Sequence, residues 1–114
     1  MPKEQSLGLA QIQALLKELP GWEFQNNAIQ TRYKTDGWPM TLMVVNAVGF
    51  VCEAGFHHPD LNVSWGEVTV RLWTHSAGGI TNKDFEMARR IDKAIRWGPG
   101  PEDSLTGPPK PIVK

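Results

Sequence analysis

The chain has 114 residues, of which 40% are hydrophobic and 21% are charged, and that length suits one domain with a single core. Twelve basic and twelve acidic residues give a formal net charge of zero, which argues against nucleic acid or an anionic membrane surface as the main partner. The one cysteine, Cys52, excludes an intrachain disulfide. It suits a reducing compartment, and no secretory leader is recognisable, so we expect a cytoplasmic protein.

The N-terminal part of the chain predicts a helix and then a β-hairpin. Apolar residues at helical spacing predict a helix over Leu9–Leu19, which Pro20 ends. Residues 22–25 and 29–34 each alternate apolar and polar side chains, as strands with one buried face do. The Asn26–Asn27 pair joins them, and asparagine tolerates the positive φ of a tight turn.

The segment 38–55 is rich in valine and methionine, so its composition alone would also suit a strand. Its length favours a helix, with Pro39 in the first turn and Gly55 at the end. Its apolar stretch is too short and too interrupted for the roughly 20 residues of a membrane span. One apolar face would face the core, and we interpret a second face as a subunit contact. The core-facing residues are Met40, Val44, Ala47, Val48 and Val51, and the second face has Val45, Gly49 and Cys52.

The C-terminal half predicts a second hairpin and a third helix. Residues 61–65 and 68–74 alternate around Gly66. The sequence Thr-x-x-Asp at 81–84 has the form of a capping box that begins a helix. Residues 98–114 are rich in proline and glycine, so we expect an extended or disordered tail there.

These elements follow the order helix, hairpin, helix, hairpin, helix. The fold class that they predict is α+β, with a four-stranded antiparallel sheet and three helices packed on one face. Residues 1–97 would form the domain and residues 98–114 its tail.

All three histidines fall in one short window. His57 and His58 are adjacent at the end of the long helix, His75 ends the last strand, and Glu53 lies one helical turn before His57. Histidine gives and takes protons near neutral pH, so this cluster predicts acid–base chemistry. Neighbouring side chains of an extended chain point apart, so we do not expect His57 and His58 to project in parallel.

Each remaining candidate also has a purely structural interpretation. The capping box and the helix dipole already account for Asp84. Trp65 and Trp73 suit strands, and they could equally give a flat wall for a planar heterocycle. Cys52 is interpreted as a small buried hydrophobe. The acidic and histidine residues lack the spacing of a specific zinc motif, so we expect no metal.

The spacing Glu53-x3-His57-His58-Pro59-x5-Trp65-x9-His75-x8-Asp84 resembles the signature of the pterin-4a-carbinolamine dehydratases. Leu-Pro-Gly-Trp at 19–22 and Thr-His-Ser-Ala-Gly-Gly-Ile-Thr at 74–81 are also similar to motifs of that family. The resemblance covers about residues 9–97. Phe56 and Trp73 depart from the residues common in the family, and neither replaces a histidine.

The resemblance implies the function of 4a-hydroxytetrahydrobiopterin dehydratase, which removes water from 4a-hydroxytetrahydropterin and uses no cofactor. It implies His57, His58 and His75 as catalytic residues, with His57 and His75 as the acid–base pair. The substrate-binding residues that it implies are Glu53, Pro59, Trp65, Trp73 and Asp84.

The family also implies a second class of function. Some members act as dimerisation cofactors of a transcription factor or assist RuBisCO assembly with little or no catalysis. The expected partners are therefore a pterin, a second copy in a homodimer or homotetramer, and either an aromatic amino acid hydroxylase or RuBisCO.

Overall fold

The computed structural model describes residues 5–114, and its elements follow the predicted order. The elements are α1 (Leu9–Leu16), β1 (Glu23–Gln25), β2 (Ala28–Lys34), α2 (Trp38–Gly55), β3 (Asp60–Ser64), β4 (Glu67–Leu72), the 3-10 helix η1 (His75–Ala77) and α3 (Asn82–Ile95).

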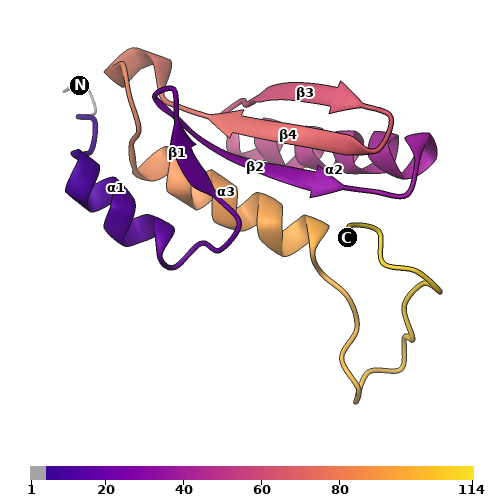
Figure 1. The fold of residues 1–114 in the computed structure, drawn as a ribbon. Helices are drawn as coiled ribbons and strands as arrows, with labels where there is room; N and C mark the ends of the chain where they lie inside the picture. Colours follow the sequence, from indigo (N-terminus) through magenta and orange to yellow (C-terminus); the bar gives the residue numbers. More distant parts are fainter. Residues whose placement is uncertain (1–4) are drawn as a thin grey trace.

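The four strands form one antiparallel sheet in the order β1-β2-β4-β3. The longest pairing joins β2 to β4, from Ile29 opposite Leu72 to Lys34 opposite Glu67. The three α-helices pack on one side of this sheet (Figure 1). The predicted α+β fold class, with four antiparallel strands and helices on one face, is confirmed.

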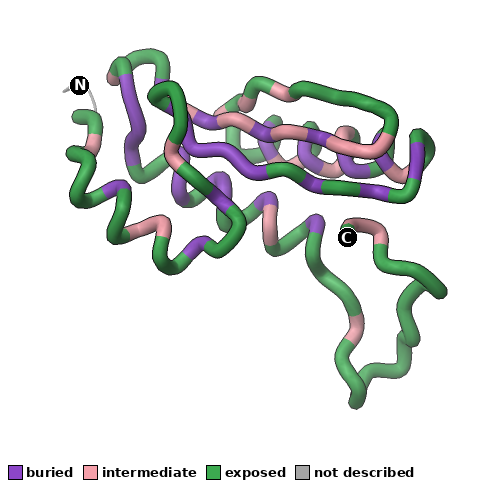
Figure 2. Tube along the Cα trace, in the orientation of Figure 1, coloured by how far each residue is buried: buried purple, intermediate pink, exposed green. Residues whose placement is uncertain are grey.

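The core lies between the sheet and the helices. Alternation along β4 turns Val68, Val70 and Leu72 toward the helices, where all three are fully buried (Figure 2). Phe85 and Ile91 of α3 are buried against them in the same cluster. Fully burying one such side chain contributes about 1.5–3 kcal/mol, so this layer holds the ends of α2 and α3 in place.

The two faces of α2 differ from the prediction at Cys52. The buried stripe runs through Thr41, Val44, Val48 and Cys52, at spacings of three and four residues, so Cys52 belongs to the core side. The prediction that Cys52 is a small buried hydrophobe is confirmed, and its assignment to the second face is wrong. The apolar residues that α2 exposes are Trp38, Leu42, Met43 and Phe50.

By length and mean hydropathy α2 meets a criterion for a membrane span, and 22% of that window is buried. A mostly buried core helix of a water-soluble protein meets the same criterion, so length and hydropathy alone do not distinguish the two. In this fold α2 packs against α3, β3 and β4.

Helix α1 and strand β4 end two or more residues earlier than the sequence predicts, and the strand boundaries elsewhere shift by one residue. Helix α1 ends at Leu16 because the next turns are closed by i→i−3 hydrogen bonds, from Glu18 to Leu15 and from Leu19 to Leu16. Strand β4 ends at Leu72 rather than at residue 74, and the unpredicted helix η1 follows. An isolated antiparallel bridge between Thr74 and Gly79 closes that turn.

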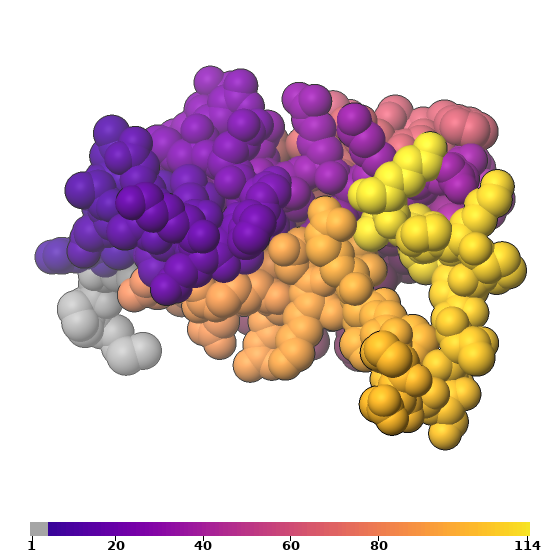
Figure 3. Space-filling model, turned by 60° about the horizontal axis from the view of Figure 1, so that its bottom comes forward, coloured from indigo at the N-terminus to yellow at the C-terminus, as the bar shows by residue number. Residues whose placement is uncertain are grey.

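Residues 98–114 contain no helix or strand, yet the end of the tail folds back onto the domain. The backbone N–H of Lys114 donates to the carbonyl of Lys34 at 2.8 Å, and its Nζ lies 2.8 Å from Oδ1 of Asp36. Ile112 and Val113 pack against the core. Figure 3 shows the yellow end of the chain resting on the purple residues of this region.

Candidate active site

The end of α2 sets the positions of the two adjacent histidines. Phe56 follows the last helical residue in the left-handed conformation, with φ 53° and ψ 47°. This conformation turns the chain sharply, and the backbone N–H of His57 donates to the carbonyl of Cys52 at 3.1 Å. Pro59 then keeps His58 out of helical geometry and leads the chain into β3.

The buried carboxylate of Asp84 holds the ring of His57. Nε2 of His57 lies 2.6 Å from Oδ1 of Asp84, whose side chain has no exposed surface. The other oxygen, Oδ2, accepts hydrogen bonds from Thr74 Oγ1 at 2.8 Å and from the backbone N–H of Thr81 at 2.9 Å. The predicted capping box is therefore confirmed, and the same carboxylate also fixes a ring nitrogen of His57.

Glu53 partners His58. Its Oε1 lies 2.8 Å from Nε2 of His58, and both side chains are more than half exposed. The sequence had placed Glu53 beside His57, but the turn at Phe56 carries His57 toward α3 instead. The two adjacent histidines thus contact different acids on different elements. This agrees with the prediction that their side chains do not project in parallel.

The third histidine, His75, is held by an aromatic ring. Its imidazole stacks on the indole of Trp73 with ring centroids 4.4 Å apart and planes 27° apart. The guanidinium of Arg71 lies over the same indole, 5.7 Å from its centroid. Within residues 5–114 neither ring nitrogen of His75 has a hydrogen-bond partner, so both can meet a ligand.

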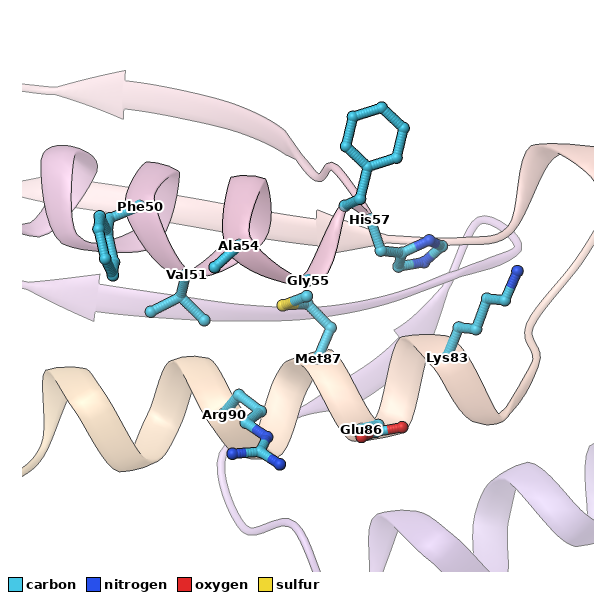
Figure 4. A pocket seen from close by; sticks show the side chains of 10 residues that line it. Phe50, Val51, Ala54, Gly55, His57, Lys83, Glu86, Met87 and Arg90 are labelled. Atoms are coloured by element: carbon cyan, nitrogen blue, oxygen red, sulfur yellow. The ribbon is translucent and has the colours of Figure 1, made fainter.

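The three histidines line one open cavity of about 320 Å³ between the end of α2 and the start of α3. Its lining is Phe56, His57, His58, Trp73, Thr74, His75, Ser76 and Lys83. A groove of about 500 Å³ between α2 and α3 adjoins this cavity and shares Phe56, His57 and Lys83 with it. Figure 4 shows His57 at one end of that groove, beside Lys83 and Met87 of α3.

One predicted site residue lies elsewhere. Trp65 occupies the turn between β3 and β4, 67% exposed, and its ring would lie 3.4 Å from a Cβ placed on Gly37. Gly37 precedes α2, whereas the histidines follow the other end of that helix. Eighteen residues of helix span about 27 Å, so the structure does not bring Trp65 into the cavity.

Residues 5–94 match the family described as Pterin 4 alpha carbinolamine dehydratase. The chain belongs to this family.

Curated relatives agree with this assignment. A protein of Aquifex aeolicus is 44% identical over 86 residues, covering 75% of this chain and 87% of its own. One of Xylella fastidiosa, strain M12, is 41% identical over 98 residues, covering 84% of each chain. Both are named "Putative pterin-4-alpha-carbinolamine dehydratase".

A solved structure from Brucella melitensis is similar in fold. It is named a transcriptional coactivator/pterin dehydratase, and it superposes with a TM-score of 0.74 at 26% identity. The match covers 79% of this chain and 98% of that one. The helices and sheet described above are therefore those of a pterin carbinolamine dehydratase fold.

The sequence missed several residues that shape the cavity of this family member. Thr74 donates to Asp84, and Phe56, Ser76 and Lys83 line the wall. Thr74 and Ser76 flank His75 in the motif that resembles the family, which is the signal that could have found them. Phe56 was noted only as a departure from the family. Its position in the lining of the cavity follows from its left-handed backbone, which the sequence did not predict.

In the described part of the chain, neither a reactive thiol nor a metal cluster accompanies the histidines. Burial raises the pKa of the Cys52 thiol to about 11, so it stays protonated and is a poor nucleophile near neutral pH. Among residues 5–114 no three His, Cys, Asp or Glu side chains are grouped to hold a metal ion. The groups in this cavity that can move protons include the imidazoles, the carboxylates beside them and the amine of Lys83.

Proposed function

We propose that this protein is a 4a-hydroxytetrahydrobiopterin dehydratase, which converts 4a-hydroxytetrahydropterin to quinonoid dihydropterin and water. The observation that supports this most strongly is the arrangement of three histidines on one cavity with a buried carboxylate, Asp84, fixing His57. Membership of the family supports the same substrate class.

The reaction needs one acid and one base and no electron transfer. The acid protonates the hydroxyl on C4a, the C–O bond breaks, and water leaves with the bonding electron pair. The lone pair of N5 then forms the C4a=N5 double bond, and the base takes the proton from N5. A positioned acid–base pair typically accelerates such a step by about 10²–10⁴-fold.

We assign the acid and base roles to His57 and His75. Asp84 accepts a hydrogen bond from His57 Nε2, which leaves Nδ1 of His57 free to exchange a proton with the pterin. Both nitrogens of His75 are open within the described chain, and its ring lines the same cavity. An acid and a base on one cavity suit a reaction that protonates oxygen and deprotonates nitrogen.

The other predicted residues take supporting roles. His58, with Glu53, would bind and orient the pterin at the exposed side of the cavity. Pro59 keeps the backbone extended beside them. Trp65 is not assigned to a pterin bound among the histidines of the same chain, because it lies at the far end of α2.

The proposed setting is the cytoplasm, where the enzyme would regenerate pterin for an aromatic amino acid hydroxylase without a metal or organic cofactor. A homodimer or homotetramer is part of this proposal. The exposed apolar face of α2, formed by Leu42, Met43 and Phe50, offers a surface that a second copy would cover.

The test is stopped-flow absorbance of 4a-hydroxytetrahydropterin breakdown, with the intermediate generated in situ by a hydroxylase. We expect acceleration by the wild type, its loss in the variant carrying both His57→Ala and His75→Ala, and an unchanged rate for the tail variant Thr106→Ala. Circular dichroism checks that each variant is folded. A folded wild type that leaves the spontaneous rate unchanged would overturn the proposal.

A second candidate function is that of an inactive assembly factor or dimerisation cofactor. The same exposed face of α2 favours it, and the Brucella relative is named a coactivator as well as a dehydratase. A folded, catalytically silent wild type would point to this role, with RuBisCO or a transcription factor as the partner to be tested.

A further inference from the structure

We propose that Trp73 is a positioning residue that acts through His75, and that it does not offer a stacking wall to the pterin. The inference rests on the proposed function for its catalytic consequence, and its structural part stands on geometry alone. The sequence had left open whether Trp73 is a strand residue or a flat wall for a heterocycle.

Two side chains of the protein itself, His75 and Arg71, lie over the Trp73 indole. The imidazole of His75 stacks on one face at 4.4 Å between centroids, and the guanidinium of Arg71 lies 5.7 Å from the ring centroid. Arg71 lies in β4 before Trp73, and His75 begins η1 after it. A planar ligand could stack on the indole face that His75 occupies only by displacing the imidazole.

Carboxylates hold two of the three histidines of the cavity, and an aromatic ring holds the third. Asp84 bonds His57 and Glu53 bonds His58. His75 has no hydrogen bond within residues 5–114, so its stack on Trp73 is what fixes the plane of its ring. An offset stack restrains a ring while leaving both of its nitrogens open, which suits a residue that must exchange protons.

One turn supports both ends of the stack. Arg71 Nη2 donates to the carbonyl of Asn26 at 3.2 Å, and Asn27 Nδ2 donates to the carbonyl of Gly78 at 3.2 Å. Gly78 ends the short helix that begins at His75. The turn between β1 and β2 therefore fixes both Arg71 and the backbone that follows His75.

The first test is the proton NMR spectrum of the His75 ring. A ring stacked on an indole is shifted upfield, so we expect Trp73→Leu to remove that shift and Trp73→Phe to keep part of it. Trp97→Leu is the matched control, since Trp97 is 65% exposed beyond the end of α3. An unchanged His75 signal in a folded Trp73→Leu variant would overturn the inference.

The second test is steady-state kinetics with the hydroxylase-coupled assay. A misplaced catalytic ring lowers the chemical step, so we expect kcat of Trp73→Leu to fall by about tenfold with KM nearly constant, and Trp73→Phe to recover most of it. A raised KM with an unchanged kcat would mean direct contact with the pterin and would overturn the inference. If the wild type is inactive, the proposed function fails, and the NMR result still decides whether Trp73 holds His75.

Discussion

The carboxylate of Asp84 joins two structures that are remote in sequence. Its Oδ1 lies 2.6 Å from Nε2 of His57, and its Oδ2 accepts the backbone N–H of Thr81 at 2.9 Å. The first contact orients a candidate catalytic ring, and the second begins α3. One buried group thus serves both the chemistry of the cavity and the stability of a helix.

Asp84→Asn separates these two roles. The amide keeps the size of the side chain but loses the charge that fixes His57, so we expect kcat for dehydration to fall by about 10²-fold. The weakened buried hydrogen bonds should lower the free energy of unfolding by about 1–3 kcal/mol. Stopped-flow kinetics and urea unfolding measure the two effects.

Two control variants make the Asp84 result specific. Thr81→Ala removes the hydroxyl that accepts from the Lys83 N–H and should cost about 1 kcal/mol of stability, with a much smaller effect on kcat. Asp103→Asn changes a carboxylate in the tail and should alter neither kcat nor the free energy of unfolding. An Asp84→Asn variant with wild-type kcat would show that the carboxylate serves helix capping alone.

Substitutions at Phe56 and Phe50 test whether the backbone at Phe56 is strained, because the two residues are equally exposed but differ in backbone conformation. Both side chains are 77% exposed, but Phe56 is left-handed, with φ 53°, while Phe50 lies inside α2. Phe56→Gly should raise the free energy of unfolding by about 1 kcal/mol, because glycine adopts positive φ without strain. Phe50→Gly should lower it by about 1 kcal/mol.

The same pair tests what Phe56 contributes to binding. Its ring lines the histidine cavity and lies edge-on to His58, with centroids 5.1 Å apart. We expect Phe56→Gly to raise KM while stability increases. Urea unfolding and steady-state kinetics check both values, and a loss of stability in Phe56→Gly would contradict the strain argument.

The ion pair between Asp36 and Lys114 predicts a pH dependence of stability. The hydrogen bond and charge of Lys114 lower the pKa of Asp36 below its ordinary value. The stabilisation is therefore present above the ordinary aspartate pKa and is lost as the pH falls through the lower pKa of the folded state. Asp36→Asn should flatten the acid side of the stability profile.

Urea unfolding between about pH 2 and pH 6 measures this effect. The contribution should be small, because the pair is at the surface, and salt at about 1 M should screen it. Asp103→Asn is the control, as its carboxylate accepts a backbone hydrogen bond from Gly100. Equal acid slopes for wild type and Asp36→Asn at low salt would show that the pair does not hold the tail.

Local sequence patterns predicted the helices and strands because each pattern depends only on residues a few positions apart. Alternation along 68–72 reflects burial of one side of a strand, and Thr81 with Asp84 caps the helix that they begin. The end of α2 was predicted near Gly55 for the same reason, although the left-handed residue that ends the helix is Phe56 and not the glycine. These signals need no knowledge of the rest of the chain.

The contacts within the site depend on tertiary structure, which those patterns do not describe. Asp84 meets His57 because β3 and β4 return the chain to the end of α2, and no spacing in the sequence expresses that return. Trp65 was grouped with the histidines through the spaced motif that resembles the family, yet β3 carries it away from them. The docking of Lys114 on β2 likewise depends on a path through the tail without regular structure.

The side chains around the histidine cavity all come from positions 53 to 84, a continuous stretch that runs from the end of α2 through the β3–β4 hairpin to the start of α3 (Figure 1). The contact between His57 and Asp84 spans 27 positions, and the entropic cost of closing a loop grows only slowly with its length. One segment thus supplies the lining of the cavity, while the first hairpin supports it from outside through the β2–β4 pairing and the turn at Asn26 and Asn27.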